Sequence, residues 1–109
     1  MPAGVTADVR TYQVYINGEW AKSHSGKTFP VYDPASEEVI AMVPDCNAED
    51  VNRAVAAAKD AFENGLWAST TAQERGRVLF RLADKIRQNA AKLAELEARN
   101  CGKPIVEAE

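Results

Sequence analysis

The sequence predicts a mixed α/β arrangement, in which a small β-ribbon over about residues 12–43 is followed by two long helices at about 48–64 and 72–99. Short apolar segments separated by turn signals predict the ribbon. Apolar residues that recur every three to four positions, with capping residues at the ends, predict the helices. The length of 109 residues suits one domain or part of one, and the content of 46% hydrophobic residues is typical of a folded soluble chain.

The predicted ribbon follows a small polar stretch, residues 1–11, which we expect to be a flexible tail. Large apolar residues alternate on both sides of Asn17-Gly18, a pair that tolerates the positive φ angles of a type I′ hairpin turn. Residues 28–32 and 39–43 predict two further strands, of which the first lies at an edge because Pro30 has no N–H to donate. These pieces predict a β-ribbon or a three-stranded antiparallel element.

The two predicted helices have recognisable ends. Asn47 can cap the first helix, and Gly65 suits the position just beyond its last turn. Thr71 and Glu74 have the spacing of a capping box at the start of the second helix. Gly102, which can adopt a left-handed conformation, is expected to end it, and residues 105–109 read as the start of a further helix.

Composition excludes several functional classes. The net charge is −3, and basic residues alternate with acidic ones, which argues against a nucleic-acid-binding face. No apolar run approaches the roughly 18 residues of a membrane span and no signal sequence precedes the ribbon, so we expect a soluble, cytoplasmic protein with no membrane partner. Two cysteines and one histidine cannot supply four zinc ligands.

The residues that could act in catalysis have simpler structural explanations. His24, the only histidine, lies in a serine-rich loop and suits an exposed polar residue better than a base. Cys101 is expected at a helix C-terminus, where the helix dipole does not favour a thiolate, with Lys103 pointing to solvent. We expect Trp20 and Trp67 to be packing anchors. The sequence contains no glycine-rich phosphate loop, so it predicts neither catalytic nor cofactor-binding residues.

A series of motifs occurs in a specific order and at specific spacing. It comprises Tyr15-Ile16-Asn17-Gly18-Glu19-Trp20, Phe29-Pro30-Val31-Tyr32-Asp33-Pro34-Ala35, Ala48-Glu49-Asp50-Val51, Glu74-Arg75 and Gly102-Lys103-Pro104. This series, spread over residues 12–109, resembles the N-terminal segment of the NAD(P)-dependent aldehyde dehydrogenase superfamily, and the branch around betaine aldehyde dehydrogenase looks most similar.

The resemblance implies that residues 12–109 are the N-terminal, incomplete part of a cofactor-binding domain in a longer α/β enzyme. Such enzymes use a cysteine, a glutamate and NAD or NADP to oxidise a small-molecule aldehyde to an acid, and assemble as homodimers or homotetramers. Their catalytic and cofactor-binding residues lie beyond this segment, so the 109 residues alone are expected to be inactive.

The resemblance also implies one minor site. Several relatives hold a structural K⁺ or Na⁺ ion near this segment, and the matching positions here are Val31, Tyr32 and Asn100. Ordinary turn and helix-end hydrogen bonding is the alternative explanation for these three residues.

A second functional hypothesis does not involve an enzyme. The apolar stripe of the second predicted helix could bind a partner, so that the chain would be a helical interaction module that folds alone. A monomeric, well-protected chain would favour this alternative, whereas an aggregating or dynamic chain would favour a segment with an exposed interface.

Overall fold

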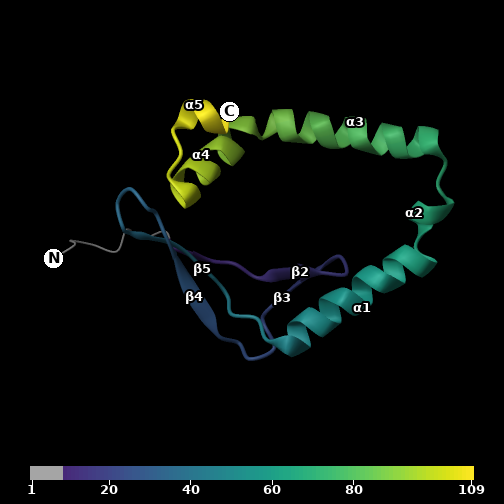
Figure 1. The fold of residues 1–109 in the computed structure, drawn as a ribbon, viewed down its shortest axis with the longest axis horizontal. Coiled ribbons are helices and arrows are strands. Elements are labelled where there is room, and N and C mark those ends of the chain that lie inside the picture. Colours follow the sequence, from purple (N-terminus) through teal and green to yellow (C-terminus); the bar gives the residue numbers. More distant parts are fainter. Residues whose placement is uncertain (1–8) are drawn as a thin grey trace.

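The computed structural model describes residues 9–109. The strands and helices, in chain order, are β1 (Arg10–Thr11), β2 (Val14–Ile16), β3 (Glu19–Ala21), β4 (Thr28–Tyr32), β5 (Val39–Pro44), α1 (Ala48–Asn64), α2 (Leu66–Ser69), α3 (Ala72–Gln88), α4 (Ala90–Cys101) and α5 (Ile105–Ala108). The predicted order of strands followed by helices is confirmed (Figure 1).

The strands form two separate sheets. One has the order β1-β5-β4, with β4 antiparallel and β1 parallel to the central strand β5, and the other is the hairpin of β2 and β3. The predicted β-ribbon is confirmed by the antiparallel pairs β2–β3 and β4–β5. Its alternative, a three-stranded antiparallel element, is wrong, because the chain leaves β1, makes the hairpin outside the sheet and returns as β4. Arg10 and Thr11, which the sequence placed in a flexible tail, pair with Ala41 and Met42. The rest of that expectation, for residues 1–8, lies outside the described residues.

Two local predictions for the strands are confirmed. Asn17 and Gly18 have φ angles of 53° and 78°, both positive as a type I′ turn requires. Pro30 lies in the edge strand β4 opposite Met42, where its missing N–H costs the sheet little.

The helix starts also follow the sequence. Asn47 accepts hydrogen bonds from the N–H groups of Glu49 and Asp50, and the Asp50 side chain accepts from the Asn47 N–H, so that α1 begins with a complete capping box. Thr71 and Glu74 form the same arrangement at the start of α3.

The prediction of one continuous second helix is wrong, because the structure has two helices there, α3 and α4. Residues 72–99 are interrupted at Asn89, whose backbone has φ −111° and ψ 14°. The side-chain amide of Asn89 donates to the Lys85 carbonyl at 2.8 Å. Asparagine competes in this way for backbone carbonyls and ends helices, and α4 starts again directly beyond it and runs to Cys101.

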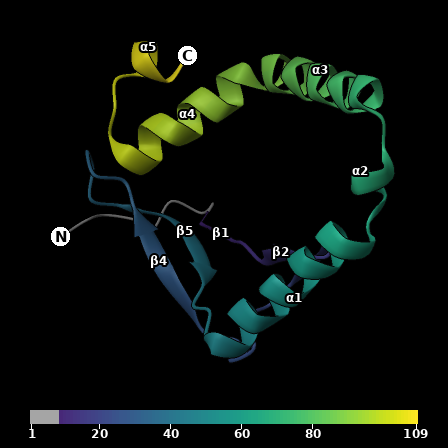
Figure 2. The same ribbon diagram turned by 45° about the vertical axis from the view of Figure 1, so that its right-hand side comes forward.

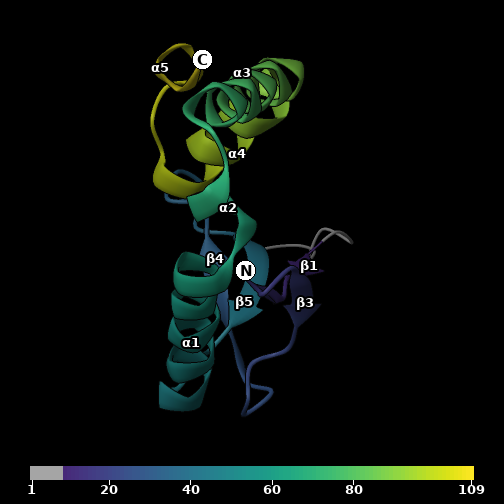
Figure 3. The same cartoon turned by 90° about the vertical axis from the view of Figure 1, so that its right-hand side faces the viewer.

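The elements follow one another around an open arc rather than around a filled core (Figure 2). The radius of gyration is 17.9 Å, whereas a compact chain of this length has a value of about 13 Å. In the described residues Ala94 is the one buried apolar side chain. In the view turned by 90°, α3, α4 and α5 lie together in the upper half of the molecule, and α1 and the strands lie in the lower half (Figure 3).

The two ends of the arc meet near the turn after β4. Gly102, with φ 77°, caps α4 as predicted, and a Cβ atom at this position would lie 3.1 Å from Cγ of Pro34. Within residues 9–109, no helix has the length and apolarity needed to cross a bilayer.

Candidate functional site

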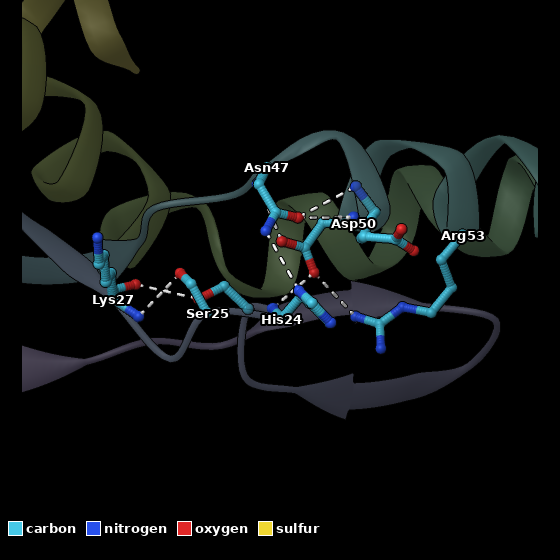
Figure 4. A network of polar contacts seen from close by, with 8 residues as sticks. His24, Ser25, Lys27, Asn47, Asp50 and Arg53 are labelled. Atoms are coloured by element: carbon cyan, nitrogen blue, oxygen red, sulfur yellow. Dashed lines mark hydrogen bonds and ion pairs between the residues drawn. The ribbon is translucent and has the colours of Figure 1, made fainter.

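The most connected polar cluster joins the loop after β3 to the start of α1 (Figure 4). At its centre is the Asp50 carboxylate, which is almost fully buried. Its Oδ1 accepts from the His24 N–H at 2.8 Å, and its Oδ2 accepts from the Asn47 N–H at 3.0 Å. The Arg53 guanidinium lies 3.4 Å from Oδ1. One side chain thus ties together segments that are 26 positions apart.

These contacts stabilise the ionised form of Asp50. The hydrogen bond from the Asn47 backbone lowers the pKa of the Asp50 carboxyl most, burial opposes this by raising it, and the His24 N–H and the Arg53 charge lower it further. The net pKa lies below the ordinary value, because hydrogen bonds to the charged form outweigh desolvation.

The cluster contains hydroxyl groups and an imidazole but no catalytic arrangement. The exposed His24 ring places Nδ1 3.3 Å from the Asn47 side-chain amide. Ser23 donates to the Lys27 carbonyl, and Ser25 accepts from the Lys27 N–H, so both hydroxyl groups hold the loop. A nucleophile paired with a base would need a hydroxyl within hydrogen-bond reach of the imidazole. The geometry fits a structural clasp, in which the backbone and the exposed ring of His24 both contact the start of α1.

Cys101 is the last residue of α4, at the helix end that the sequence predicted. Its Sγ lies 3.1 Å from the Glu97 carbonyl and 3.7 Å from the Glu97 carboxylate, so its surroundings are acceptors rather than cations. Lys103, expected to point to solvent, instead forms an ion pair with Glu97 at 3.2 Å. An active thiolate needs a cation or a helix N-terminus, and Cys101 has neither as its contact.

The two tryptophans, expected to be packing anchors, are not enclosed by the described residues. Trp20 is 64% exposed and Trp67 is 47% exposed. Trp20 contacts Tyr15 across the hairpin, with ring centroids 4.9 Å apart. The rings lack the surrounding side chains that would bury them.

The positions expected to hold a monovalent cation lie at the ends of two elements. Val31 and Tyr32 end β4, with an irregular register between them. Asn100 lies in the last turn of α4 and lines a groove of about 420 Å³ with Glu97 and Lys103. Between residues 9 and 109, no group of three or more histidine, cysteine or acidic side chains is arranged to hold a metal ion.

Comparison with known proteins gives a consistent result. The profile of the aldehyde dehydrogenase family matches residues 20–109. The mitochondrial aldehyde dehydrogenase family 2 member B4 of Arabidopsis thaliana is 51% identical over 92 residues, which are 84% of this chain and 17% of that protein. Cytosolic aldehyde dehydrogenase 1 of Elephantulus edwardii is 44% identical over 99% of this chain and 22% of its own length.

Solved structures agree with the sequence relatives. The NAD-dependent aldehyde dehydrogenase of Sinorhizobium meliloti superposes with a TM-score of 0.87 at 36% identity, over 93% of this chain and 20% of that one. Betaine aldehyde dehydrogenase of Staphylococcus aureus gives a TM-score of 0.84 at 40% identity, over 88% of this chain and 19% of that one. Relatives with other names are as similar, so the betaine aldehyde branch is not singled out.

The chain spans about one fifth of the length of the relatives it matches. The match nevertheless covers most of the chain in sequence and in fold, and it includes the hairpin, the capped helix α1 and the Gly-Lys-Pro end of α4. The chain therefore belongs to the aldehyde dehydrogenase family.

Proposed function

We propose that this chain serves an enzyme that oxidises a small-molecule aldehyde to a carboxylic acid with NAD⁺ or NADP⁺. The observation that carries the proposal is the family match over residues 20–109, together with relatives of 44–51% identity that are named as aldehyde dehydrogenases. The nicotinamide cofactor would accept the hydride, and one of the similar Bacillus cereus structures is described as an NAD⁺ complex.

The role of the described residues in that enzyme is structural. Residues 12–109 form part of the cofactor-binding domain, and their helices wrap the remainder of it. The exposed apolar side chains support this proposal, because Phe62 on α1 and Phe80 on α3 are 83% and 77% exposed. Large apolar patches on a soluble chain mark surfaces that another part of a protein covers. The chemistry would come from residues outside this chain.

Complementation of a relative tests both parts of the proposal. The Bacillus cereus aldehyde dehydrogenase, with the segment that aligns with residues 20–109 deleted, should lose NAD⁺-dependent aldehyde oxidation. Adding the purified 109-residue chain should restore activity, whereas the chain alone should have none.

The matched control is the same chain with Phe62→Asp and Phe80→Asp, which should bind poorly and restore little. Two results would contradict the proposal. One is aldehyde oxidation by the chain alone that is lost in Cys101→Ser. The other is full restoration of activity by the double variant.

We also propose a K⁺ or Na⁺ site formed by the carbonyls of Val31 and Tyr32 and the side-chain oxygen of Asn100. Oxygen donors of this kind suit monovalent cations, which exchange hydration water for carbonyl oxygens. In protein that contains this chain, KCl should raise the melting temperature above that in choline chloride, and Asn100→Leu should remove the difference. Equal melting temperatures of the unmodified protein in both salts would refute the site.

The assembly and the cellular location are two further parts of the proposal. We propose a cytoplasmic homodimer or homotetramer, although the relatives include proteins named mitochondrial and cytosolic. Light scattering of the purified enzyme and fractionation of the source cells test these two statements, and a monomer or an organellar protein would contradict them.

A further inference from the structure

The chain contains two Asn-Gly dipeptides, Asn17-Gly18 and Asn64-Gly65. This pair is chemically special, because a glycine has no side chain to block attack of its backbone nitrogen on the preceding asparagine amide. Both asparagines are exposed, so solvent access does not distinguish them. We propose that Asn17 is a site of spontaneous deamidation in the folded protein and that the fold protects Asn64.

The reaction needs only solvent water. The Gly18 nitrogen forms a bond with Cγ of Asn17 and loses its proton to solvent, while the bond from Cγ to Nδ2 breaks and ammonia leaves. Water then opens the resulting cyclic imide at either carbonyl, which yields aspartate or isoaspartate. No atom is oxidised or reduced, and the net change is the exchange of ammonia for water.

At Asn64 both reacting groups are held. The Gly65 N–H donates to the Ala61 carbonyl at 3.1 Å, as the last bond of α1. The Asn64 amide donates to the Asp60 carboxylate at 2.9 Å. The space around Gly65 is filled by the Ala61 backbone, which a Cβ atom would strike. Cyclisation there requires the helix end to unravel and both hydrogen bonds to break.

At Asn17 the two reacting groups, the side-chain amide and the Gly18 nitrogen, are not held within the described chain by hydrogen bonds like those at Asn64. Within residues 9–109 the structure contains no hydrogen bond to the Asn17 side chain or to the Gly18 N–H. Apart from atoms of residues 17–19 themselves, no heavy atom of the described chain lies within 4 Å of a Cβ built at Gly18. The left-handed backbone of Asn17 does not have the geometry of the imide ring, so the turn must open before the reaction.

The hairpin is short, and its aromatic side chains are exposed. It has three cross-strand pairs, and its aromatic pair, Tyr15 and Trp20, is 60% and 64% exposed. Two-stranded hairpins are marginally stable unless another element covers them. Local opening of this kind controls the access of solvent chemistry to a folded chain.

The product would alter the place where the hairpin meets α1. Asn17 and Glu19 line a groove of about 380 Å³ with Arg53 and Asp60. A carboxylate at position 17 would add negative charge beside Glu19 and Asp60. Isoaspartate would also insert a methylene into the backbone of a two-residue turn, whose length sets the register of the strands. We therefore expect the hairpin to separate from α1.

Peptide mapping by mass spectrometry tests the proposal on protein incubated at mildly alkaline pH. We expect Asn17 to lose its amide at least about tenfold faster than Asn64, which corresponds to opening free energies that differ by about 1.4 kcal/mol. In concentrated urea the two rates should converge, because both dipeptides are then unprotected. The residues before the two asparagines differ, Ile16 and Glu63, and can change the intrinsic deamidation rate. Dividing each native rate by the rate in urea removes this difference.

Two variants sharpen the comparison. Asn17→Gln should remove the modification, because glutamine must form a larger and slower ring, and should leave the rate at Asn64 unchanged. Asp60→Ala should raise the rate at Asn64, because the Asn64 amide then loses its hydrogen-bond acceptor. Equal native rates at the two sites, after correction with the urea rates, or faster loss at Asn64 would overturn the proposal.

Discussion

Asp50 connects a helix start with a distant loop through a single carboxylate. The sequence identified the cap, since Asn47 and two acids at a helix start are a known signal. The bond from the His24 N–H could not be predicted, because it depends on where the loop after β3 comes to lie. The same reasoning explains why the sequence predicted an exposed loop residue at His24 but did not identify its part in the clasp.

Asp50→Asn should lower the melting temperature, because an amide cannot match the charge that the N–H donors and Arg53 stabilise. The folded-state pKa of Asp50 is depressed, so its contribution is fully present above the unfolded-state pKa and is lost as pH falls through the folded-state pKa. The difference in melting temperature between the two proteins should therefore shrink in that acidic window.

Glu49→Gln is the control for Asp50→Asn, since Glu49 is an exposed neighbour in the same helix turn. Its melting temperature should stay much closer to that of the unmodified chain than does that of Asp50→Asn, because an exposed acid in the first turn interacts only weakly with the helix dipole. A difference for Asp50→Asn that stays constant down to strongly acidic pH would contradict the role assigned to the carboxylate.

At the scale of elements, the break at Asn89 shows how a periodic pattern can conceal a helix end. Apolar residues continue in phase from Val78 to Leu96, which is why the sequence predicts one helix. The presence of two helices is seen only in the structure, in the hydrogen bond from the Asn89 side chain to the Lys85 carbonyl and in the non-helical ψ angle of Asn89. Because of the break, α4 runs back toward the strands (Figure 2). Its C-cap, Gly102, lies next to Pro34.

Asn89→Ala should join α3 and α4 more closely, because alanine has the higher helix propensity and cannot bond the Lys85 carbonyl. We expect greater helicity by far-UV circular dichroism and a stability change within about 0.7 kcal/mol of zero. Asn64→Ala, at another helix end, should not lengthen a helix, since Gly65 still follows. Unchanged helicity in Asn89→Ala would mean that the surrounding fold, not Asn89, sets the break.

At the scale of the molecule, the chain has helices with apolar faces and almost no interior. Phe62, Leu66 and Phe80 are each more than three quarters exposed, and among residues 9–109 Ala94 is the one buried apolar side chain. A stable domain must bury such surface, because apolar burial is the main favourable term in folding. The described residues therefore depend on further structure for much of their stability.

The isolated chain should bind a fluorescent hydrophobic dye and self-associate. Phe62→Ser with Phe80→Ser should reduce both, with a stability change within about 0.5 kcal/mol per site, since exposed positions contribute little to folding. Lys59→Ser with Arg81→Ser is the matched polar control and should not reduce dye binding. A monomeric chain without dye binding would instead support an independently folded module.

The sequence by itself determined the local features: the Asn-Gly turn, the edge position of Pro30, both capping boxes and the Gly102 cap. Each depends on residues within a few positions of one another, so backbone geometry and local hydrogen bonds are sufficient. The sequence also determined the family, through the order and spacing of motifs over residues 12–109. The tertiary structure alone decided the parallel pairing of β1, the loop held by Asp50 and the exposure of Trp20 and Trp67. These features depend on where distant segments meet, and residue patterns encode that only through the packing they produce.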